Sequence, residues 1–208
     1  MSSPRPEKRR AITEAARRVF GTEGYARAAV DAIAAEAGVS KRTVYNHFRD
    51  KEDLFLSVAL EGGHEVTAAI ARLLEKHLRK IVDVTEDLTA FALERVAAVW
   101  EFPDHFALVR TIEAEAARIP RPVLDAWIEA GPQTAHLRLA PYLAGMADRG
   151  LLSLGDATAE LAADHFNLLT VVNVNQRTFY GAVPLPEDEV TETVTTGVRT
   201  FLRLYGPP

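Results

Sequence analysis

Apolar residues recur at helical spacing along almost the whole chain, and this pattern constrains the fold more than any other feature. Near the amino terminus they occupy positions i, i+3, i+4, i+7 and i+8, the spacing of one helix face: Ile12, Ala15, Ala16, Val19 and Phe20. Most prolines stand at or near the starts of such stretches, where a helix tolerates them. Runs of β-branched residues are too isolated to build a sheet. The sequence therefore predicts an all-α fold.

The same periodicity predicts where the helices lie. The expected ranges are 6–24, 30–37, 41–48, 51–81, 85–101, 103–118, 121–130, 132–149, 157–180 and 187–205. Pro141 lies inside one of them and is expected to kink or split that helix. Gly62 and Gly63 lie inside the long fourth helix, where a glycine costs roughly 1 kcal/mol relative to alanine. Two interpretations of this pair stay open: a hinge that transmits ligand binding, or a tolerated kink.

Composition limits the class of protein. The chain has 208 residues, 48% apolar and 25% charged, which is ordinary for a globular protein with one large or two modest domains. It has no cysteine, so disulfides and thiolate metal sites are excluded and a reducing compartment is expected. We expect no membrane partner, because we see no apolar run able to span a bilayer and residues 1–10 do not resemble a signal sequence. These features predict a cytoplasmic protein.

The formal net charge of −5 argues by itself against a nucleic-acid partner, but the charge is unevenly distributed. Residues 1–51 contain 11 Lys and Arg against 6 Asp and Glu, a net charge of +5. Residues 52–208 contain 13 against 23, a net charge of −10. A basic module on an acidic body is typical of a phosphate-contacting domain joined to a domain that makes no such contact. Uneven surface charge without function is the alternative.

Residues 28–51, AAVDAIAAEAGVSKRTVYNHFRDK, carry the pattern of two short helices joined by a turn, a helix-turn-helix over residues 29–48. Gly38 supplies the positive φ that the turn needs. Val39 is expected to fill the angle between the helices, and Ala34 is small enough to let them approach. Ser40 is expected to cap the second helix, as Asp50 caps the long helix that follows.

The second helix of this motif presents polar side chains away from its apolar face, and such a set suits the major groove of DNA. Arginine reads guanine edges, asparagine reads adenine edges, and threonine contacts a thymine methyl group or a phosphate. Tyr45 and Lys51 are better placed for phosphate contacts, which set register without reading sequence. The candidate DNA-binding residues are Arg27, Ser40, Lys41, Arg42, Thr43, Tyr45, Asn46, His47 and Lys51.

Nothing in the sequence points to catalysis. The six histidines show no HExxH or other ligand spacing, and no GxSxG, GxGxxG or Walker motif occurs. We therefore expect no catalytic residues, no metal site and no cofactor. A helix-turn-helix that serves as a protein-interaction module is an alternative. Salt-insensitive binding would favour it, because phosphate contacts weaken steeply with salt.

The segment AVDAIAAEAGVSKRTVYNHFRDKEDLF resembles the DNA-binding signature of the TetR family of bacterial regulators. The matching features include Ala37-Gly38-Val39-Ser40, Thr43-Val44-Tyr45, His47-Phe48 and Lys51-Glu52-Asp53-Leu54. One departure is that Ala28 and Ala29 stand where the family usually has Thr or Ser, so a helix cap worth about 1 kcal/mol is missing. We expect this departure to affect DNA affinity and not the class of function.

The chain around Arg118, Trp127 and residues 147–152 resembles the subgroup with AefR-like carboxy-terminal domains. The resemblance implies a three-helix DNA-binding domain over residues 5–60, joined by a long helix to an effector-binding and dimerisation domain over residues 61–208. It implies a homodimeric repressor that a small-molecule effector releases from a palindromic double-stranded DNA operator. A transcriptional activator is an alternative, because whether a bound regulator represses or activates a gene depends on the position of its operator.

The resemblance also implies that the last two long helices form a four-helix bundle with a partner subunit. The candidate interface residues are Phe166, Leu169, Val172, Val194, Val198 and Phe201, with intramolecular core as the alternative. An effector pocket needs apolar walls and a few polar groups, and a small apolar effector is expected. The candidate ligand-binding residues are Phe91, Trp100, Phe106, Trp127 and Asn167, although aromatic residues in helices are more often plain core.

Overall fold

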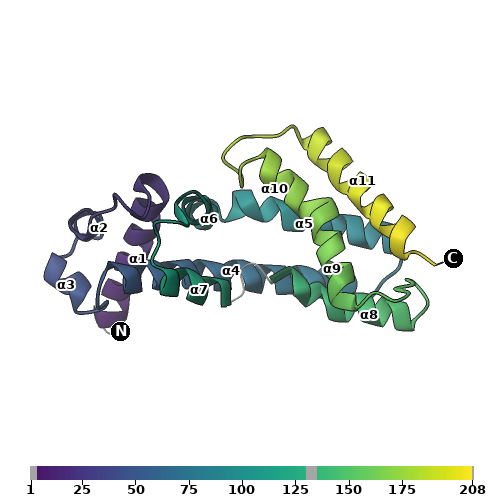
Figure 1. Ribbon diagram of the computed structural model, residues 1–208, viewed down its shortest axis with the longest axis horizontal. Helices are drawn as coiled ribbons and strands as arrows, with labels where there is room; N and C mark the ends of the chain where they lie inside the picture. Colours follow the sequence, from purple (N-terminus) through teal and green to yellow (C-terminus); the bar gives the residue numbers. More distant parts are fainter. Residues whose placement is uncertain (1–3, 130–134, 208) are drawn as a thin grey trace. The chain divides into compact units, whose positions relative to one another are not determined.

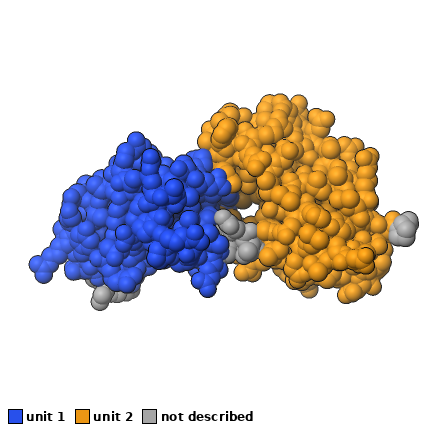
Figure 2. Space-filling view, in the orientation of Figure 1, with its two compact units in different colours: residues 1–65, 102–132 blue, residues 66–101, 133–208 orange. Residues whose placement is uncertain are grey.

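The computed structural model describes residues 4–129 and 135–207, and every regular element in these ranges is helical (Figure 1). The predicted all-α fold is confirmed. The chain divides into two compact units, residues 1–65 with 102–132 and residues 66–101 with 133–208 (Figure 2). Residues 102–132 thus group with the amino-terminal module, whereas the sequence-based division places them in the second domain. The domain boundary at residue 60 stays a prediction.

The first unit combines the amino-terminal helices with two helices from the middle of the chain. Its elements are α1 (Pro4–Glu23), α2 (Val30–Glu36), α3 (Lys41–Tyr45), the first part of α4 (Lys51–Leu78), α6 (Pro103–Glu115) and α7 (Arg121–Glu129). The whole apolar stripe predicted on α1 is buried. An aromatic cluster adjoins it, in which the Phe55 ring centre lies 4.9 Å from that of Phe20 and 4.8 Å from that of Tyr25.

Helix α6 packs along α1 in this unit. A Cβ added to Gly21 would lie 3.1 Å from the Cβ of Ala107, so the two backbones approach closely. The buried Oγ1 of Thr111 donates a hydrogen bond of 3.2 Å to the carbonyl oxygen of Phe20. This bond supplies a partner for a buried hydroxyl and fixes the register of α6 on α1.

The second unit is built around an aromatic core. Its elements are the remainder of α4, α5 (Val84–Glu101), the 3₁₀ turn η1 (Ala135–Leu139), α8 (Ala140–Asp148), α9 (Ala159–Asn167), the π-helical turn η2 (Leu168–Val172), α10 (Asn173–Arg177) and α11 (Glu187–Tyr205). The ring centre of Phe166 lies 6.1 Å from that of Phe91 and 5.2 Å from that of Phe201. Helix α11 approaches η2 so closely that a Cβ on Gly197 would clash with the carbonyl group of Leu169.

Several helix boundaries differ from the prediction. The helix expected over residues 157–180 spans 159–177 and contains the π-helical turn. Pro141 does split its helix, since it stands in the first turn of α8 directly after η1. The first residues of that expected helix, 132–134, lie outside the described residues. α3 ends at Tyr45, because Phe48 turns into the core and Asp50 then caps α4 by accepting the N–H of Asp53 at 2.7 Å.

Helix α4 runs without a break through Gly62 and Gly63. Gly62 has a packing reason to be glycine, because a Cβ there would lie 2.6 Å from Nδ1 of His105 on α6. By length and composition only, α4 is also long and apolar enough to cross a membrane, contrary to the expectation that no stretch would be. A helix in a protein core has the same length and composition, and 44% of the stretch is buried inside the chain.

Candidate nucleic-acid interface

Helices α2 and α3 form the predicted helix-turn-helix. The turn depends on Gly38, whose φ of +65° is strained for a residue with a side chain. The N–H of Val39 donates to the carbonyl oxygen of Ala34 at 2.9 Å and closes the turn. Ile33 of α2 and Val44 of α3 are buried. These contacts fix α3 on the unit and leave its opposite face in solvent.

The two helices of the motif begin differently. Ala29 precedes α2 and makes no side-chain capping bond, so the missing cap is confirmed. At α3 the Oγ of Ser40 accepts the N–H of Thr43 at 3.1 Å, which confirms the predicted cap. The two hydroxyl groups of Ser40 and Thr43 also bond to each other at 2.8 Å. Both hydroxyls are therefore engaged in holding the start of α3.

The exposed face of α3 and the turn after it carries four of the predicted DNA-binding residues: Lys41, Arg42, Tyr45 and Asn46. Thr43 and His47 are half-buried beside them. Nζ of Lys41 pairs with Oδ2 of Asp31 on α2 at 2.9 Å, and this hydrogen bond raises the pKa of Lys41. Within residues 4–129 and 135–207, Arg42 forms no ion pair, so its guanidinium has no internal counter-charge on this face.

Lys51 and Arg27 flank the loop between α1 and α2. Nζ of Lys51 donates to the carbonyl oxygen of Ala26 at 3.4 Å and lies 4.8 Å from the centre of the Tyr25 ring. Burial lowers the pKa of Lys51, against the opposing charges of nearby carboxylates. Nε of Arg27 donates to the carbonyl oxygen of Glu23 at 2.9 Å. The fold therefore holds two basic groups beside the motif.

A carboxylate of α6 reaches the same loop. Oε2 of Glu115 accepts the backbone N–H of Ala26 at 2.9 Å. Its carboxyl group also lies against Gly24, which has a φ of +83° and no room for a Cβ. Glu115 is the carboxylate with the largest electrostatic effect on Lys51. No spacing in the sequence signals this contact, because Glu115 and Ala26 are 89 residues apart.

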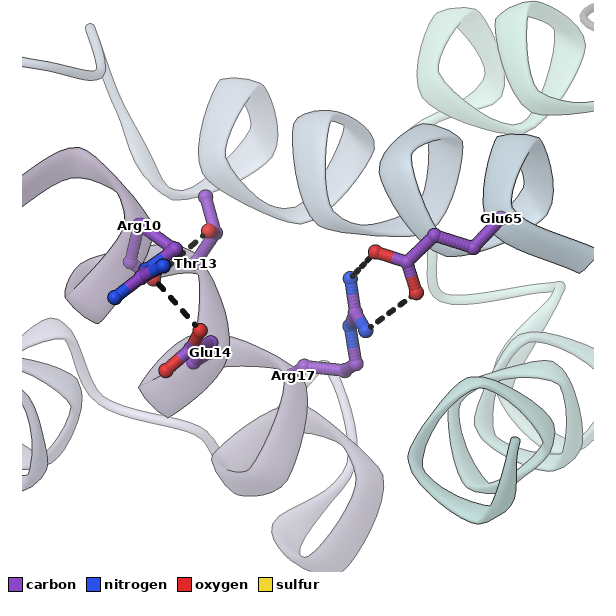
Figure 3. Close-up of polar contacts among 5 residues, drawn as sticks. All are labelled: Arg10, Thr13, Glu14, Arg17 and Glu65. Atoms are coloured by element: carbon purple, nitrogen blue, oxygen red, sulfur yellow. Dashed lines mark hydrogen bonds and ion pairs between the residues drawn. The ribbon is translucent and has the colours of Figure 1, made fainter. Parts of the chain in front are cut away.

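A second polar cluster joins α1, α4 and α6. Arg17 and Glu65 point toward each other and form two bonds, Nη1 to Oε2 at 3.1 Å and Nη2 to Oε1 at 3.2 Å (Figure 3). Burial, and then the charge of Arg17, lower the pKa of His105 to about 4, with Glu65 opposing. His105 is therefore neutral at pH 7. Sequence reasoning missed this cluster too, since Arg17 and Glu65 are 48 residues apart.

The predicted effector-binding residues are divided between the two units. Phe106 and Trp127 belong to the first unit, and Phe91, Trp100 and Asn167 belong to the second. Phe91 and Trp127 are buried in the core, whereas Trp100 is exposed. In the second unit, Oδ1 of Asn167 accepts a hydrogen bond of 2.7 Å from Nη1 of Arg95, a residue that the sequence did not single out.

The predicted dimer-interface residues fall into two groups. Four of them are fully buried within the chain itself, as in the intramolecular alternative: Phe166, Val194, Val198 and Phe201. Leu169 and Val172 are half-buried on η2. Beside Leu169 an open groove of about 510 Å³ runs along α11, lined there by Thr193, Thr196 and Gly197. The four core residues are therefore not accessible to a partner, whereas the groove is open to solvent.

Two family models match the sequence. The model for bacterial regulatory proteins of the tetR family matches residues 12–58. The model for the AefR-like transcriptional repressor carboxy-terminal domain matches residues 86–207, more than half of the chain. The chain belongs to the TetR family.

Individual proteins agree with this assignment. The transcriptional repressor AcnR of Corynebacterium jeikeium is 33% identical over 172 residues, which cover 73% of this chain and 88% of AcnR. A TetR-family regulator structure from Mesorhizobium loti is 31% identical, with a TM-score of 0.84 over 99% of this chain and 100% of that one. The flavonoid-responsive regulator FrrA is 26% identical, with a TM-score of 0.69 over 96% and 97% of the two chains. With two other curated repressors the alignments span only 35% and 40% of the relatives' length.

Membership of the TetR family confirms the resemblance of both parts of the chain. Because members of the family are transcriptional regulators, it also confirms the prediction of a regulator and not an enzyme. TetR-family regulators bind DNA and act as dimers. In the part of the chain that the structure describes, no cluster of His, Asp and Glu is arranged to hold a metal ion.

Proposed function

We propose that this TetR-family chain is a dimeric cytoplasmic repressor that binds a palindromic operator through α3 and leaves it when a small-molecule effector binds. The observation that carries the proposal is the exposed face of α3. Among the residues that the structure describes, Arg42 there has no ion pair; Asn46 is exposed, and α3 is anchored by buried Val44. A guanidinium and an amide are the groups that read guanine and adenine edges in the major groove.

The relatives support the two halves of this proposal separately. AcnR, which aligns over most of its length, is a transcriptional repressor. FrrA, which shares the fold at 26% identity, is a regulator that responds to flavonoids. The first supports repression and the second supports release by a small organic molecule.

The test of DNA recognition is a footprint on the DNA that flanks the protein's own coding sequence. Arg42→Ala and Asn46→Ala are each expected to reduce operator discrimination by roughly 1–3 kcal/mol, the worth of a bidentate base contact. Arg203→Ala, an exposed arginine on α11, is the matched control and is expected to footprint normally. A normal footprint from the Arg42→Ala/Asn46→Ala double variant would show that α3 does not read the operator.

Salt dependence separates DNA binding from the protein-interaction alternative. Lys51 lies beside the motif, so Lys51→Ala is expected to weaken binding to all DNA sequences about equally and to lower the salt slope by about 1. Partner binding that is insensitive to salt would favour the protein-interaction module. A reporter gene under the operator distinguishes repression from activation, because its expression rises on deletion of a repressor and falls on deletion of an activator.

The occupant of the groove along α11 is proposed to be a second copy of the chain. The exposed Thr196 and the half-buried Thr193 are small enough to allow a partner helix to approach, and the groove continues to the half-buried Leu169. Thr196→Arg is expected to shift the protein to monomer in sedimentation analysis, because it fills the groove. Thr191→Arg makes the same change at an exposed position outside this groove and is expected to stay dimeric. A dimer that survives Thr196→Arg would place the interface elsewhere.

A further inference from the structure

Arg95 on α5 is a cation without a counter-charge. Its Nη1 donates to the neutral amide of Asn167 at 2.7 Å. Its Nε is buried and finds no acceptor among residues 4–129 and 135–207, and none of their carboxylates pairs with it. The remaining residues, 1–3, 130–134 and 208, include no Asp or Glu. No carboxylate side chain of this chain therefore neutralises Arg95 through an ion pair.

The contrast with Arg17 shows that the chain does supply a carboxylate to a shielded arginine elsewhere. The side chain of Arg17 is 16% exposed, and Glu65 binds it through both carboxylate oxygens. At Arg95 burial lowers the pKa to about 10, and no acidic group opposes this shift. Arg95 as a whole is half-buried, with its Nε fully shielded from solvent. The guanidinium still carries its charge at pH 7, and a partly shielded charge without a partner is unfavourable for folding. A role other than stability is the better explanation for Arg95.

Arg95 and Asn167 adjoin the aromatic core of the second unit. Phe91 precedes Arg95 by one helical turn, and Phe166 precedes Asn167 directly. The two phenyl rings are buried and stacked, with centres 6.1 Å apart and planes 30° apart. Apolar walls with a few converging polar groups are typical of ligand pockets. The Nε–Nη2 edge of Arg95 has no acceptor among the described residues, and such an edge matches the two oxygens of a carboxylate.

We propose that Arg95 and Asn167 bind the carboxylate group of the effector, which is therefore a small organic anion with an apolar body. This inference rests on the proposed function, because only that proposal makes the bound molecule an effector. Binding of a carboxylate at the site is nevertheless measurable without DNA. It sharpens the expectation of an apolar effector, because a purely apolar molecule would leave the charge of Arg95 unmatched.

The experiment is a thermal melt of the full chain with a graded panel of carboxylates: acetate, butyrate, octanoate, benzoate and 1-naphthoate. Each acid is compared with its primary amide, which has the same shape and no charge. At about ten times Kd, binding to the folded state alone raises Tm by roughly 3–6 °C. We expect at least one carboxylate to give such a rise and its amide to give none.

Three variants assign the response to this pair. Arg95→Met is expected to raise Tm of the ligand-free protein, because it removes a shielded charge, and to abolish the carboxylate response. Asn167→Asp keeps the size of the side chain and places a counter-charge beside Arg95. It is therefore also expected to raise Tm of the ligand-free protein and to abolish the carboxylate response. Arg72→Met, at an exposed arginine of α4, is expected to keep the wild-type response.

The outcomes divide the two proposals. The site is overturned if no carboxylate of the panel raises Tm, if the amides act equally, or if Arg95→Met and Asn167→Asp keep the response. If a carboxylate of a second subunit already pairs with Arg95, then Arg95→Met will have a lower Tm than the wild type without ligand. That result would also overturn the site. A carboxylate that stabilises the protein through Arg95 but does not release operator DNA leaves the site standing and overturns effector-controlled release.

Discussion

Glu115 at the end of α6 accepts a hydrogen bond of 2.9 Å from the backbone N–H of Ala26, in the loop that leads into the helix-turn-helix. Thr111, one turn earlier on α6, donates a hydrogen bond of 3.2 Å to the carbonyl oxygen of Phe20. Two side chains of α6 thus form hydrogen bonds to the end of α1 and to the loop after it. A displacement of α6 would pull directly on the segment that positions α2 and α3.

Removing the charge of Glu115 is expected to raise DNA affinity. Glu115→Gln keeps an acceptor for Ala26, so the stability should change little, whereas the repulsion between its carboxylate and DNA phosphate disappears. Glu115→Ala loses the acceptor and is expected to cost about 1 kcal/mol of stability. Urea denaturation and DNA titrations measure the two effects. Glu129→Gln is the control, since it removes an exposed charge on α7; equal DNA affinities for the two variants would refute a specific role of Glu115.

His105 is expected to make the protein less stable as the pH falls below 6.5. Its pKa is lowered to about 4 by burial and by Arg17, so between pH 6.5 and 4 the unfolded chain binds a proton that the folded chain does not. Stability therefore rises with pH across this window, by about 3 kcal/mol in total from this group. Urea midpoints measured from pH 4 to 7 should flatten in His105→Leu. They should keep their slope in His64→Asn, because His64 is exposed.

Two helical glycines are expected to respond to alanine with opposite signs. Gly62→Ala places a Cβ 2.6 Å from Nδ1 of His105 and is expected to cost about 1–3 kcal/mol through overpacking. Gly145→Ala on α8 meets nothing within 4 Å and is expected to add up to about 1 kcal/mol, the helix propensity of alanine. Chemical denaturation distinguishes the two. A stabilising Gly62→Ala would remove the packing reason for this glycine and favour a hinge.

Restoring the missing cap of α2 is expected to stabilise the helix-turn-helix. Ala29 has the extended backbone of an N-cap residue, with φ −101° and ψ 139°, so Ala29→Ser is expected to add about 1 kcal/mol. Ser40→Ala removes the bond to the N–H of Thr43 and is expected to cost about the same. Thermal melts of the two variants should shift by roughly 2–4 °C in opposite directions. An unchanged Tm in Ala29→Ser would mean that another group already satisfies the start of α2.

Local features of the motif were predictable from the sequence. The turn at Gly38, the cap at Ser40 and the absent cap at Ala29 each depend on a few neighbouring residues, and all three are confirmed. The apolar stripe of α1 is confirmed for the same reason. Helix ends were less predictable, because the end of α3 depends on where buried Phe48 meets the core.

The sequence by itself determined an all-helical chain with a helix-turn-helix, because helical periodicity and capping act within about four residues. The tertiary structure alone decided which apolar faces are internal, as at Val194 and Phe201, since an apolar stripe looks the same whichever helix covers it. It also decided which polar groups meet: Glu65 reaches Arg17 across 48 residues, whereas Arg95 donates to the neutral amide of Asn167 across 72. Such pairings depend on how helices pack against one another, and no local spacing encodes them.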